Sequence, residues 1–414
     1  MTLRLFALCI LCVPGIAMAE SADSTTWPQW RGPDRDGIVA TDQAWPDDLS
    51  GIRQTWRIEL GPGYSGPIVA ADRVFVAETY KKKYEIVRAL DRASGKELWK
   101  ANLRGSMSVP FFAKSNGDWI RSTPAYDGES LFVGGMRDVL ICLDAETGSK
   151  KWRVDFCKRY DTDLPGFGLV CSPMLDGDAL YVQAGMSFCR LDKQTGKTIW
   201  RTLVNESAMM SSAFSSPIKT TLGGREQIVV QTRQELCGVD PDTGEVLWST
   251  VVPSYRGMNI LTPAVYRDGI FTSTHRNATF FYKVSADDQT FSVDEAWKHS
   301  AQGYMSSPVI VGDYAYCHLG NGRAACFDLR TGKEAWRSRP FGKYWSMVTD
   351  REKILALDER GDLVLLRANP EKLEVLDKKR ISDQECWGHI AIAGNEIFVR
   401  ELNAVSAFSW DAAD

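Results

Sequence analysis

The sequence predicts an all-β fold, an eight-bladed β-propeller of four-stranded antiparallel blades. Two observations carry this prediction: a nine-residue pattern that ends in tryptophan, and a small residue followed by proline about 30 residues before it. A third is a tryptophan-bearing strand near the N-terminus that supplies the strand missing at the C-terminal end. Self-similar units of this length are typical of propeller blades.

The nine-residue pattern is Asp-x-x-[Ser/Thr]-Gly-x-x-x-Trp, and it marks the end of a blade. Its aspartate can accept hydrogen bonds from turn N–H groups, and its glycine supplies a positive φ. The tryptophan is large and flat, which suits the gap between neighbouring blades. The five copies are Asp91 to Trp99, Asp144 to Trp152, Asp192 to Trp200, Asp240 to Trp248 and Asp328 to Trp336.

The proline marks the start of a blade. Proline lacks an N–H and is tolerated at the first residue of a strand. Two short strands joined by a polar turn follow it, then a third strand and the Asp-x-x-Thr-Gly turn. Each unit therefore contains strands a, b, c and d. The opening pairs are Gly66-Pro67, Thr123-Pro124, Ser172-Pro173, Ser216-Pro217, Thr262-Pro263 and Ser307-Pro308.

Three further units are degenerate. The fifth ends at Trp297 without the usual turn, and the seventh begins near Tyr344 and carries Leu376 where tryptophan is expected. The eighth begins at Cys386 and stops after three strands. We expect the segment around Trp56 to complete the eighth blade, because this pairing removes the open strand edges. A seven-bladed ring is the alternative.

The N-terminus is typical of a signal peptide. Arg4 precedes an apolar core, and Ala17-Met18-Ala19 forms a small-x-small cleavage site. We expect cleavage after Ala19, a periplasmic or secreted location, an N-terminal extension over residues 20–51, and one propeller domain over residues 52–414. No later apolar run is long enough to span a membrane.

The composition excludes several classes of protein. The net charge of −4 argues against a nucleic-acid partner, and the four histidines form no local metal-binding pair. Eight cysteines follow the predicted signal peptide. We expect most of them to be unpaired core thiols because Cys142, Cys189, Cys237 and Cys326 occupy matching places in the repeat. We also expect a monomer.

The motif Ala-x-Asp-x-x-[Ser/Thr]-Gly-x-x-x-Trp, as in Ala89 to Trp99, resembles the tryptophan-docking repeat of quinoprotein alcohol dehydrogenases. The propeller lipoprotein of outer-membrane barrel assembly shares that repeat. The opening segment Trp27 to Gly37, with Gly63 to Pro67, is similar to exported bacterial propellers described as PQQ-binding-like. The resemblance covers nearly the whole chain after the predicted signal peptide. It implies the fold but not catalysis, since the docking tryptophans are structural in every branch.

Strand order predicts which face carries function. The d–a connections and the b–c turns share one face, and the Thr-Gly turns lie on the other. The d–a connections vary widely in length, and such variable loops often mark the binding face. The longest connection lies between Trp99 and Thr123 and holds Phe111, Phe112, Trp119 and Arg121. We expect this face to bind a protein partner or a small ligand; the alternative is that its aromatics only pack the loops onto the ring.

Residues that open each strand a should line the mouth of the channel: Tyr64, Arg121, Tyr304, Tyr344, Trp345, Trp387 and His389. Arg121, Trp345, Trp387 and His389 are candidate cofactor-binding residues, because a flat anionic quinone favours aromatic stacking and cationic partners. The alternative, which we prefer, is that these side chains plug a narrow channel.

The chain departs from the dehydrogenase pattern. It has no adjacent cysteine pair, and the Ca²⁺ ligands of the dehydrogenases find no match. Asp138, Glu235 and Glu359 lie near b–c turns, where acids are ordinarily solvated. We assign no catalytic or metal-binding residue. The predicted function is an exported non-catalytic binding platform in the cell envelope, without a cofactor; the alternative is a dehydrogenase that uses PQQ and Ca²⁺ to oxidise alcohols or sugars.

Overall fold

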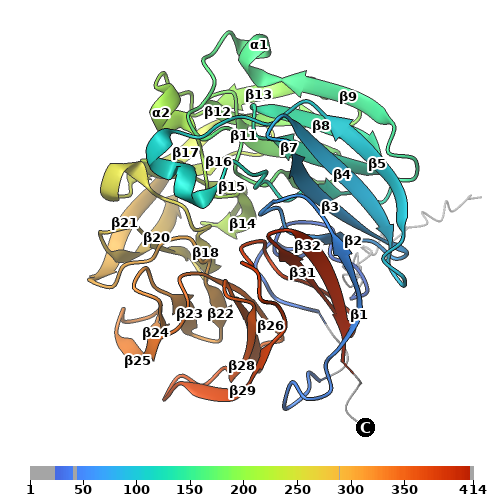
Figure 1. Cartoon of the computed structure of the whole chain (residues 1–414). Helices are drawn as coiled ribbons and strands as arrows, with labels where there is room; N and C mark the ends of the chain where they lie inside the picture. Colours follow the sequence, from blue (N-terminus) through green and yellow to red (C-terminus); the bar gives the residue numbers. More distant parts are fainter. Residues whose placement is uncertain (1–23, 41–43, 289, 411–414) are drawn as a thin grey trace, which may run out of the picture.

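The computed structural model describes residues 24–40, 44–288 and 290–410. Eight four-stranded sheets are arranged in a ring, and every pairing of neighbouring strands is antiparallel (Figure 1). Each sheet consists of four strands consecutive in the chain, except the last, in which an N-terminal strand joins three C-terminal ones. The predicted eight-bladed propeller is confirmed, and the seven-bladed alternative is wrong.

The first four blades follow the predicted units. Their strands run from the ring centre outward in chain order. They are β2 (Ile68–Val69), β3 (Arg73–Tyr80), β4 (Tyr84–Asp91) and β5 (Glu97–Leu103); β6 (Ala125–Tyr126), β7 (Ser130–Gly135), β8 (Val139–Asp144) and β9 (Lys150–Asp155); β10 (Met174–Asp176), β11 (Ala179–Ala184), β12 (Ser187–Asp192) and β13 (Thr198–Thr202); β14 (Ile218–Leu222), β15 (Arg225–Gln231), β16 (Glu235–Val239) and β17 (Val246–Val251).

The last four blades include the degenerate units. Their strands are β18 (Ala264–Tyr266), β19 (Gly269–Ser273), β20 (Thr279–Asp287) and β21 (Thr290–His299); β22 (Val309–Val311), β23 (Tyr314–His318), β24 (Arg323–Asp328) and β25 (Glu334–Pro340); β26 (Trp345–Thr349), β27 (Lys353–Asp358), β28 (Asp362–Arg367) and β29 (Glu374–Arg380); β30 (Ala391–Ala393), β31 (Glu396–Glu401), β32 (Ala404–Ser409) and β1 (Arg53–Glu59). The short helices are η1 (Phe111–Asn116), α1 (Phe156–Tyr160), α2 (Ala208–Ser211) and η2 (Tyr255–Gly257).

The N-terminal strand closes the ring. β1 pairs with β32 along its length, and Figure 1 shows the blue β1 beside the red β31 and β32. The guanidinium of Arg57 on β1 lies 3.1 Å from the carboxylate of Glu401 on β31. The predicted closure is confirmed, and it leaves no blade with an incomplete sheet.

Six docking tryptophans donate to the c–d connection of the next blade, whereas Trp248 donates to Gln227 of its own blade. The indole Nε1 of Trp99 donates to the carbonyl of Ala145 (3.0 Å), and Trp152 donates to Lys193 (2.9 Å). The turn glycine lies against the indole face: a Cβ on Gly148 would come within 2.5 Å of Trp99. The pattern therefore needs glycine twice over, for its positive φ of 72° and for the close approach.

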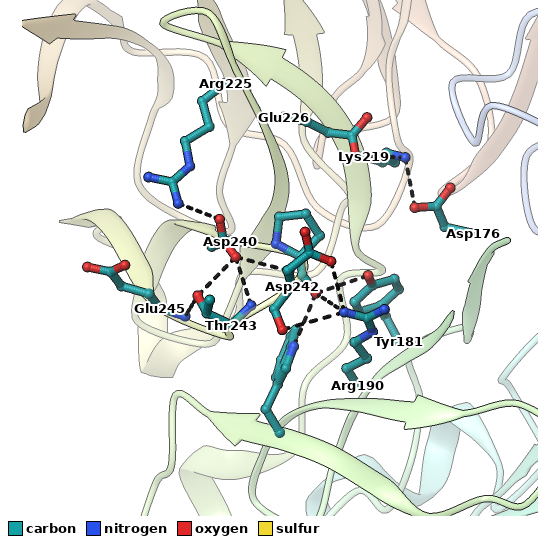
Figure 2. Close-up of polar contacts among 12 residues, drawn as sticks. Asp176, Tyr181, Arg190, Lys219, Arg225, Glu226, Asp240, Asp242, Thr243 and Glu245 are labelled. Carbon is teal, nitrogen blue, oxygen red and sulfur yellow. Dashed lines mark hydrogen bonds and ion pairs between the residues drawn. The ribbon is translucent and has the colours of Figure 1, made fainter. Parts of the chain in front are cut away.

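The aspartate of the repeat organises the turn. In the turn that follows β16, Asp240 accepts hydrogen bonds from the N–H (2.8 Å) and the hydroxyl (2.9 Å) of Thr243, as Figure 2 shows. Arg225 binds the other carboxylate oxygen of Asp240 at 2.6 Å. Asp242 extends from the same turn to Arg190 of the preceding blade (3.2 Å). The turn is therefore fixed within its blade and to its neighbour.

Blade 7 differs from the sequence prediction by one residue. Each docking tryptophan pairs with the residue before a β-bulge on strand c, as Trp99 does with Ala89. In blade 7 that register position belongs to Asp377, which pairs with Leu365, and not to Leu376. The bulge is common to the blades, but the c–d connection of blade 7 lacks the Asp-x-x-[Ser/Thr]-Gly pattern that sets the number of residues before the tryptophan position. Trp45 and Leu49 of the N-terminal extension, with Ile52 just before β1, belong to the hydrophobic cluster that joins blades 7, 8 and 1.

Buried apolar side chains form clusters between successive blades rather than one central core. The eight cysteines of the described ranges are all unpaired, and seven of them are buried. No helix in those ranges is long and apolar enough to cross a membrane.

The N-terminal segment crosses the middle of the ring. Trp27 pairs with Val69 of blade 1, and Ile38 pairs with Thr349 of blade 7. Between them, the fully buried Arg31 donates to the carbonyl of Pro308 (2.5 Å). Arg35 donates to the carbonyls of Pro217 (2.9 Å) and Pro173 (2.8 Å). The segment, which we call the plug (residues 27–39), therefore binds the strand-opening prolines of three blades. Residues 1–19, where the signal peptide is predicted, lie outside the described ranges.

Candidate functional site

A cavity of about 290 Å³ lies where the inner strands begin, on the face that carries the d–a connections. Its lining includes Trp30 from the plug. A second cavity of about 270 Å³ is lined by Arg31, Arg35 and the inner strands of blades 4 to 6. Because the plug contributes to both cavities and binds the inner strands around it, it lies between them.

A belt of hydroxyl groups surrounds the first cavity. Each hydroxyl belongs to the residue before a strand-opening proline, and it accepts a backbone N–H from the neighbouring blade. The N–H of Thr123 donates to Ser172 Oγ (3.0 Å), and Ser172 N–H donates to Ser216 Oγ (2.9 Å). The same contact links Ser216 to Thr262 and Thr262 to Ser307. The Ser/Thr-Pro pair of the sequence therefore joins blades together, and these hydroxyls are structural.

One wall of the cavity is a stack of aromatic rings. Trp387 stacks on Tyr64, with ring centroids 5.3 Å apart and an interplanar angle of 24°, and on Tyr344 at 6.0 Å and 23°. The three residues come from blades 8, 1 and 7. Another part of the lining contains Phe112, Phe167 and Phe214, whose rings form edge contacts at 6.2 and 5.3 Å.

Three of the four candidate cofactor-binding residues, Arg121, Trp387 and His389, line this cavity. Arg121 Nη2 donates to the carbonyls of Asn116 (3.3 Å) and Gly117 (2.7 Å), which orients its guanidinium. His389 packs edge-on against Trp30, and burial lowers the pKa of its imidazole to about 3. His389 is therefore neutral at physiological pH and supplies no positive charge.

Trp345 is not at the cavity, and its predicted place at the channel mouth is wrong. It is 1% exposed and donates from Nε1 to Asp358 (3.1 Å) within blade 7. Side chains alternate across a strand, so Tyr344 faces the cavity and its neighbour Trp345 does not. Sequence reasoning missed Trp30 and Phe214, which line the cavity. The opening Trp-Pro-Gln-Trp-Arg motif was a signal for Trp30, but nothing in it located the ring centre.

The d–a connections of blades 1 to 4 form a joined rim beside the cavity. Arg233 connects three of them: it donates to the carbonyls of Met209, Gly257 (2.9 Å) and Arg256 (2.6 Å), and its guanidinium lies 5.7 Å from the ring of Phe167. The N–H of Gly166 also donates to the carbonyl of Ala208 (3.0 Å). These contacts fix α2, η2 and the loop at 161–170 relative to one another.

Large exposed apolar side chains gather on this face. Phe111 is 85% exposed and Phe112 is 54% exposed, both on η1. The other exposed apolar side chains that lie on connections or strand ends of this face are Tyr80, Val204, Met209, Val251 and Tyr255. Those on the outer strands are Leu98, Ile199, Val246 and Val375. We call the surface formed by the first two groups the loop face, and the surface of the Thr-Gly turns the turn face.

Two of the three b–c turn acids are buried, which corrects the expectation that they are solvated. Asp138 accepts the N–H of Gly185 at 2.9 Å, and Glu359 accepts the N–H of Tyr344 at 3.2 Å. Burial raises the pKa of both carboxyls, that of Asp138 to about 7. Each braces a loop, and neither lines the cavity. Glu235 is partly exposed.

The cavity does not fit PQQ with Ca²⁺. Hard Ca²⁺ needs several convergent oxygen ligands, commonly carboxylates. Among the described residues that line the cavity there is no aspartate or glutamate, and Asn116 is the one side-chain amide. A quinone with several carboxylates would also meet a single cation, Arg121. No group of three or more potential metal ligands occurs elsewhere in the part of the chain that the structure describes.

Comparison with solved structures places the fold among known propellers. The crystal structure of BamB from Moraxella catarrhalis covers 88% of this chain and 99% of its own, with a TM-score of 0.62 and 15% identity. A quinohemoprotein alcohol dehydrogenase from Pseudomonas putida HK5 covers 95% of this chain and 81% of its own, with a TM-score of 0.65 and 12% identity. At these identities the likeness shows the fold alone.

Comparison of sequences is more specific. Outer membrane protein assembly factor BamB of Moranella endobia is 24% identical over 325 residues, which cover 76% of this chain and 69% of that protein. A 1-butanol dehydrogenase (quinone) of Thauera butanivorans is 25% identical over 172 residues, covering 37% of this chain and 26% of that protein. The family model described as outer membrane protein assembly factor BamB matches residues 82–338, more than half of the chain. The chain therefore belongs to the family of outer membrane protein assembly factor BamB.

Proposed function

We propose that this protein is an exported, non-catalytic propeller that binds a protein partner through its loop face in the cell envelope. The observation that carries the proposal is the concentration of exposed apolar side chains there, led by Phe111 and Phe112. Exposed apolar clusters on a folded protein mark interaction sites, and aromatic residues are enriched at such sites.

The rim is suited to this role because its loops are fixed before any partner binds. Arg233 ties two connections together through backbone carbonyls and contacts a third through the ring of Phe167. Binding to loops that are already ordered costs less conformational entropy than binding that must order them. The loop face therefore offers an apolar surface on a rigid support.

The family supports the kind of partner. Two relatives that align over about three quarters of this chain carry the name outer membrane protein assembly factor. We infer a partner of that assembly process, and a periplasmic location that follows cleavage after Ala19. We expect the propeller to act as a monomer.

Site-specific photo-crosslinking in the native host tests the proposal. A photoreactive residue at position 111 should crosslink to one main protein, identified by mass spectrometry as a component of outer-membrane assembly. Leu98 is the matched control because it is an exposed apolar residue on outer strand β5. Equal crosslinking from both positions, or none from 111, would contradict the proposal.

Deletion of residues 106–117 separates binding from packing. These residues include η1 with Phe111 and Phe112. If the rim is a binding surface, the deletion variant keeps its unfolding temperature, and a photoreactive residue at Val251, elsewhere on the loop face, no longer crosslinks to the partner. Loss of folding would instead support the alternative, in which the aromatics only pack the loops onto the ring.

The second candidate is a PQQ-dependent dehydrogenase that oxidises alcohols or sugars. The named quinone-linked relative and the aromatic stack beside Arg121 favour it, whereas the absence of carboxylates among the described cavity-lining residues opposes it. Titration of the purified protein with PQQ and Ca²⁺, followed by cofactor absorbance and dye-linked oxidation, decides the matter. Binding with turnover would replace the first proposal, and no binding at high micromolar PQQ removes the second.

A further inference from the structure

Among the described residues that line the cavity, two buried hydrogen-bond donors have no acceptor. They are Nε of Arg121 and Nε1 of Trp387, and both residues line the cavity. An unsatisfied buried donor costs free energy, more so when it carries a charge. A ligand in the cavity that carries an acceptor would therefore satisfy these donors.

Both donors belong to residues that contact the ring of Tyr64. The guanidinium carbon of Arg121 lies 6.0 Å from the ring centroid of Tyr64, and the Trp387 ring stacks on Tyr64 at 5.3 Å. Arg121 is already held by the carbonyls of Asn116 and Gly117 through its other nitrogen, Nη2. Its free Nε–H is therefore oriented before a ligand arrives, which limits the entropic cost of binding.

The charge of the cavity calls for one anionic group. Arg121 is the one arginine or lysine among the described residues of the lining, and arginine stays protonated at neutral pH. Asp118 acts electrostatically on Arg121, and Glu385 on Tyr64, but both acids lie outside the lining. Asp118 accepts the N–H of Val109 at 2.8 Å. His389 is neutral, as described above. One cation without a lining carboxylate balances one negative charge.

The remaining surface favours a flat apolar body. The Tyr64–Trp387–Tyr344 stack forms one wall, and Met258, Ile260 and the phenylalanines contribute others. A volume of about 290 Å³ is at the small end of the usual range for ligand sites, roughly 300–1,000 Å³.

We propose that this cavity binds a small planar monocarboxylic acid. Its carboxylate accepts hydrogen bonds from Arg121 Nε and Trp387 Nε1, and its apolar body packs among the aromatic walls. The loop face and the cavity share Phe112, but this proposal does not rest on the partner proposed for the loop face, because its tests probe Arg121 and Trp387 rather than the exposed loop-face residues.

Calorimetric titration of the purified full-length protein tests the site with three probes: naphthoate, the neutral naphthamide of the same shape, and benzenetricarboxylate. Naphthoate should bind at least about tenfold more tightly than naphthamide, because a charge-assisted pair of hydrogen bonds contributes more than about 1.4 kcal/mol. Naphthoate should also bind more tightly than the tricarboxylate, which brings three charges to one cation.

Two variants locate the site. Trp387→Phe keeps an aromatic ring and removes the N–H donor, and Arg121→Gln removes the charge; each should weaken naphthoate binding about tenfold while naphthamide binding is unchanged. Arg153→Gln on outer strand β9 is the matched control and should leave both affinities unchanged. If Arg121→Gln fails to fold, Trp387→Phe remains as the test. Equal affinity for naphthoate and naphthamide, tighter binding of the tricarboxylate, or no binding of naphthoate at millimolar concentration would each overturn the proposal.

Discussion

The acidic residues on the turn face and on the loop face of the ring differ in burial, and their carboxyl pKa values shift in opposite directions. On the turn face, Asp91, Asp144 and Asp192 are exposed or half-buried, and hydrogen bonds from a serine or threonine hydroxyl hold their carboxyl pKa values below the usual range. On the loop face, Glu85 and Asp138 are covered by loops, and burial raises both pKa values to about 7. The turn face carries the repeated contacts between blades. On the loop face, the two carboxyl groups are buried beneath apolar loops of variable length.

We expect the largest loss of stability from a substitution that removes a contact between blades on the turn face. Trp152→Ala removes the ring that packs against Gly196 and the hydrogen bond to the carbonyl of Lys193. We expect the free energy of unfolding to fall by about 3–5 kcal/mol, as for other tryptophan truncations. Chemical denaturation measures it. A loss below about 1 kcal/mol would mean that the joints contribute little to the ring.

Glu85 should make the stability of the loop face depend on pH. Its folded pKa of about 7 lies above its ordinary value of 4.5, so its contribution is fully present below pH 4.5 and is lost as pH rises through 7. The loss amounts to about 3 kcal/mol.

Denaturation of the wild type and of Glu85→Gln between pH 4 and pH 8 checks this. As pH rises across that window, the unfolding free energy of the wild type should fall relative to that of Glu85→Gln. Asp192→Asn is the control from the turn face: its pKa is lowered, so any contribution is lost as pH falls rather than as it rises. Parallel pH profiles for the wild type and Glu85→Gln would contradict the prediction.

The plug lies between the two faces, and its arginines should contribute an intermediate amount. Arg35 donates to the carbonyls of Ser172 (3.0 Å), Pro173 and Pro217, and burial lowers the pKa of its guanidinium to about 9. Arg35→Ala leaves these carbonyls without their donor, and we expect a loss of about 2 kcal/mol. Differential scanning calorimetry measures it; Arg351→Ala, at a surface turn, should leave the unfolding temperature unchanged.

The ring itself was predictable from the sequence because its joints repeat. The glycine and the tryptophan of the pattern contact each other across blades, as Gly148 and Trp99 do, so their spacing records a real contact. The errors were of one residue. Blade 7 lacks the turn pattern, and its register puts Asp377 rather than Leu376 at the tryptophan position. Strand alternation turns Trp345 away from the cavity. Both depend on register, which a pattern of residue types specifies only weakly.

The plug and the candidate site were only partly predictable. Arg121, Trp387 and His389 were accessible to reasoning because they open inner strands. Trp30 was not predictable, since the plug that carries it has no periodicity. The arginines of the plug bind backbone carbonyls whose positions only the closed ring defines. Long-range contacts of this kind leave no local signal in the sequence.

The smallest expected change in stability gives the sharpest test of the loop face. Phe111 is 85% exposed, so Phe111→Ser should change the free energy of unfolding by less than about 0.5 kcal/mol. If the loop face binds a partner, the same variant should lower affinity for that partner by about tenfold, because an aromatic anchor at an interface contributes well over 1 kcal/mol. Leu98→Ser on outer strand β5 should leave that affinity unchanged.

Affinity measured by surface plasmon resonance against the crosslinked partner distinguishes the outcomes. Equal losses from the two variants would mean that exposure of an apolar side chain, rather than its place on the loop face, determines binding, and the functional difference between the faces would then disappear.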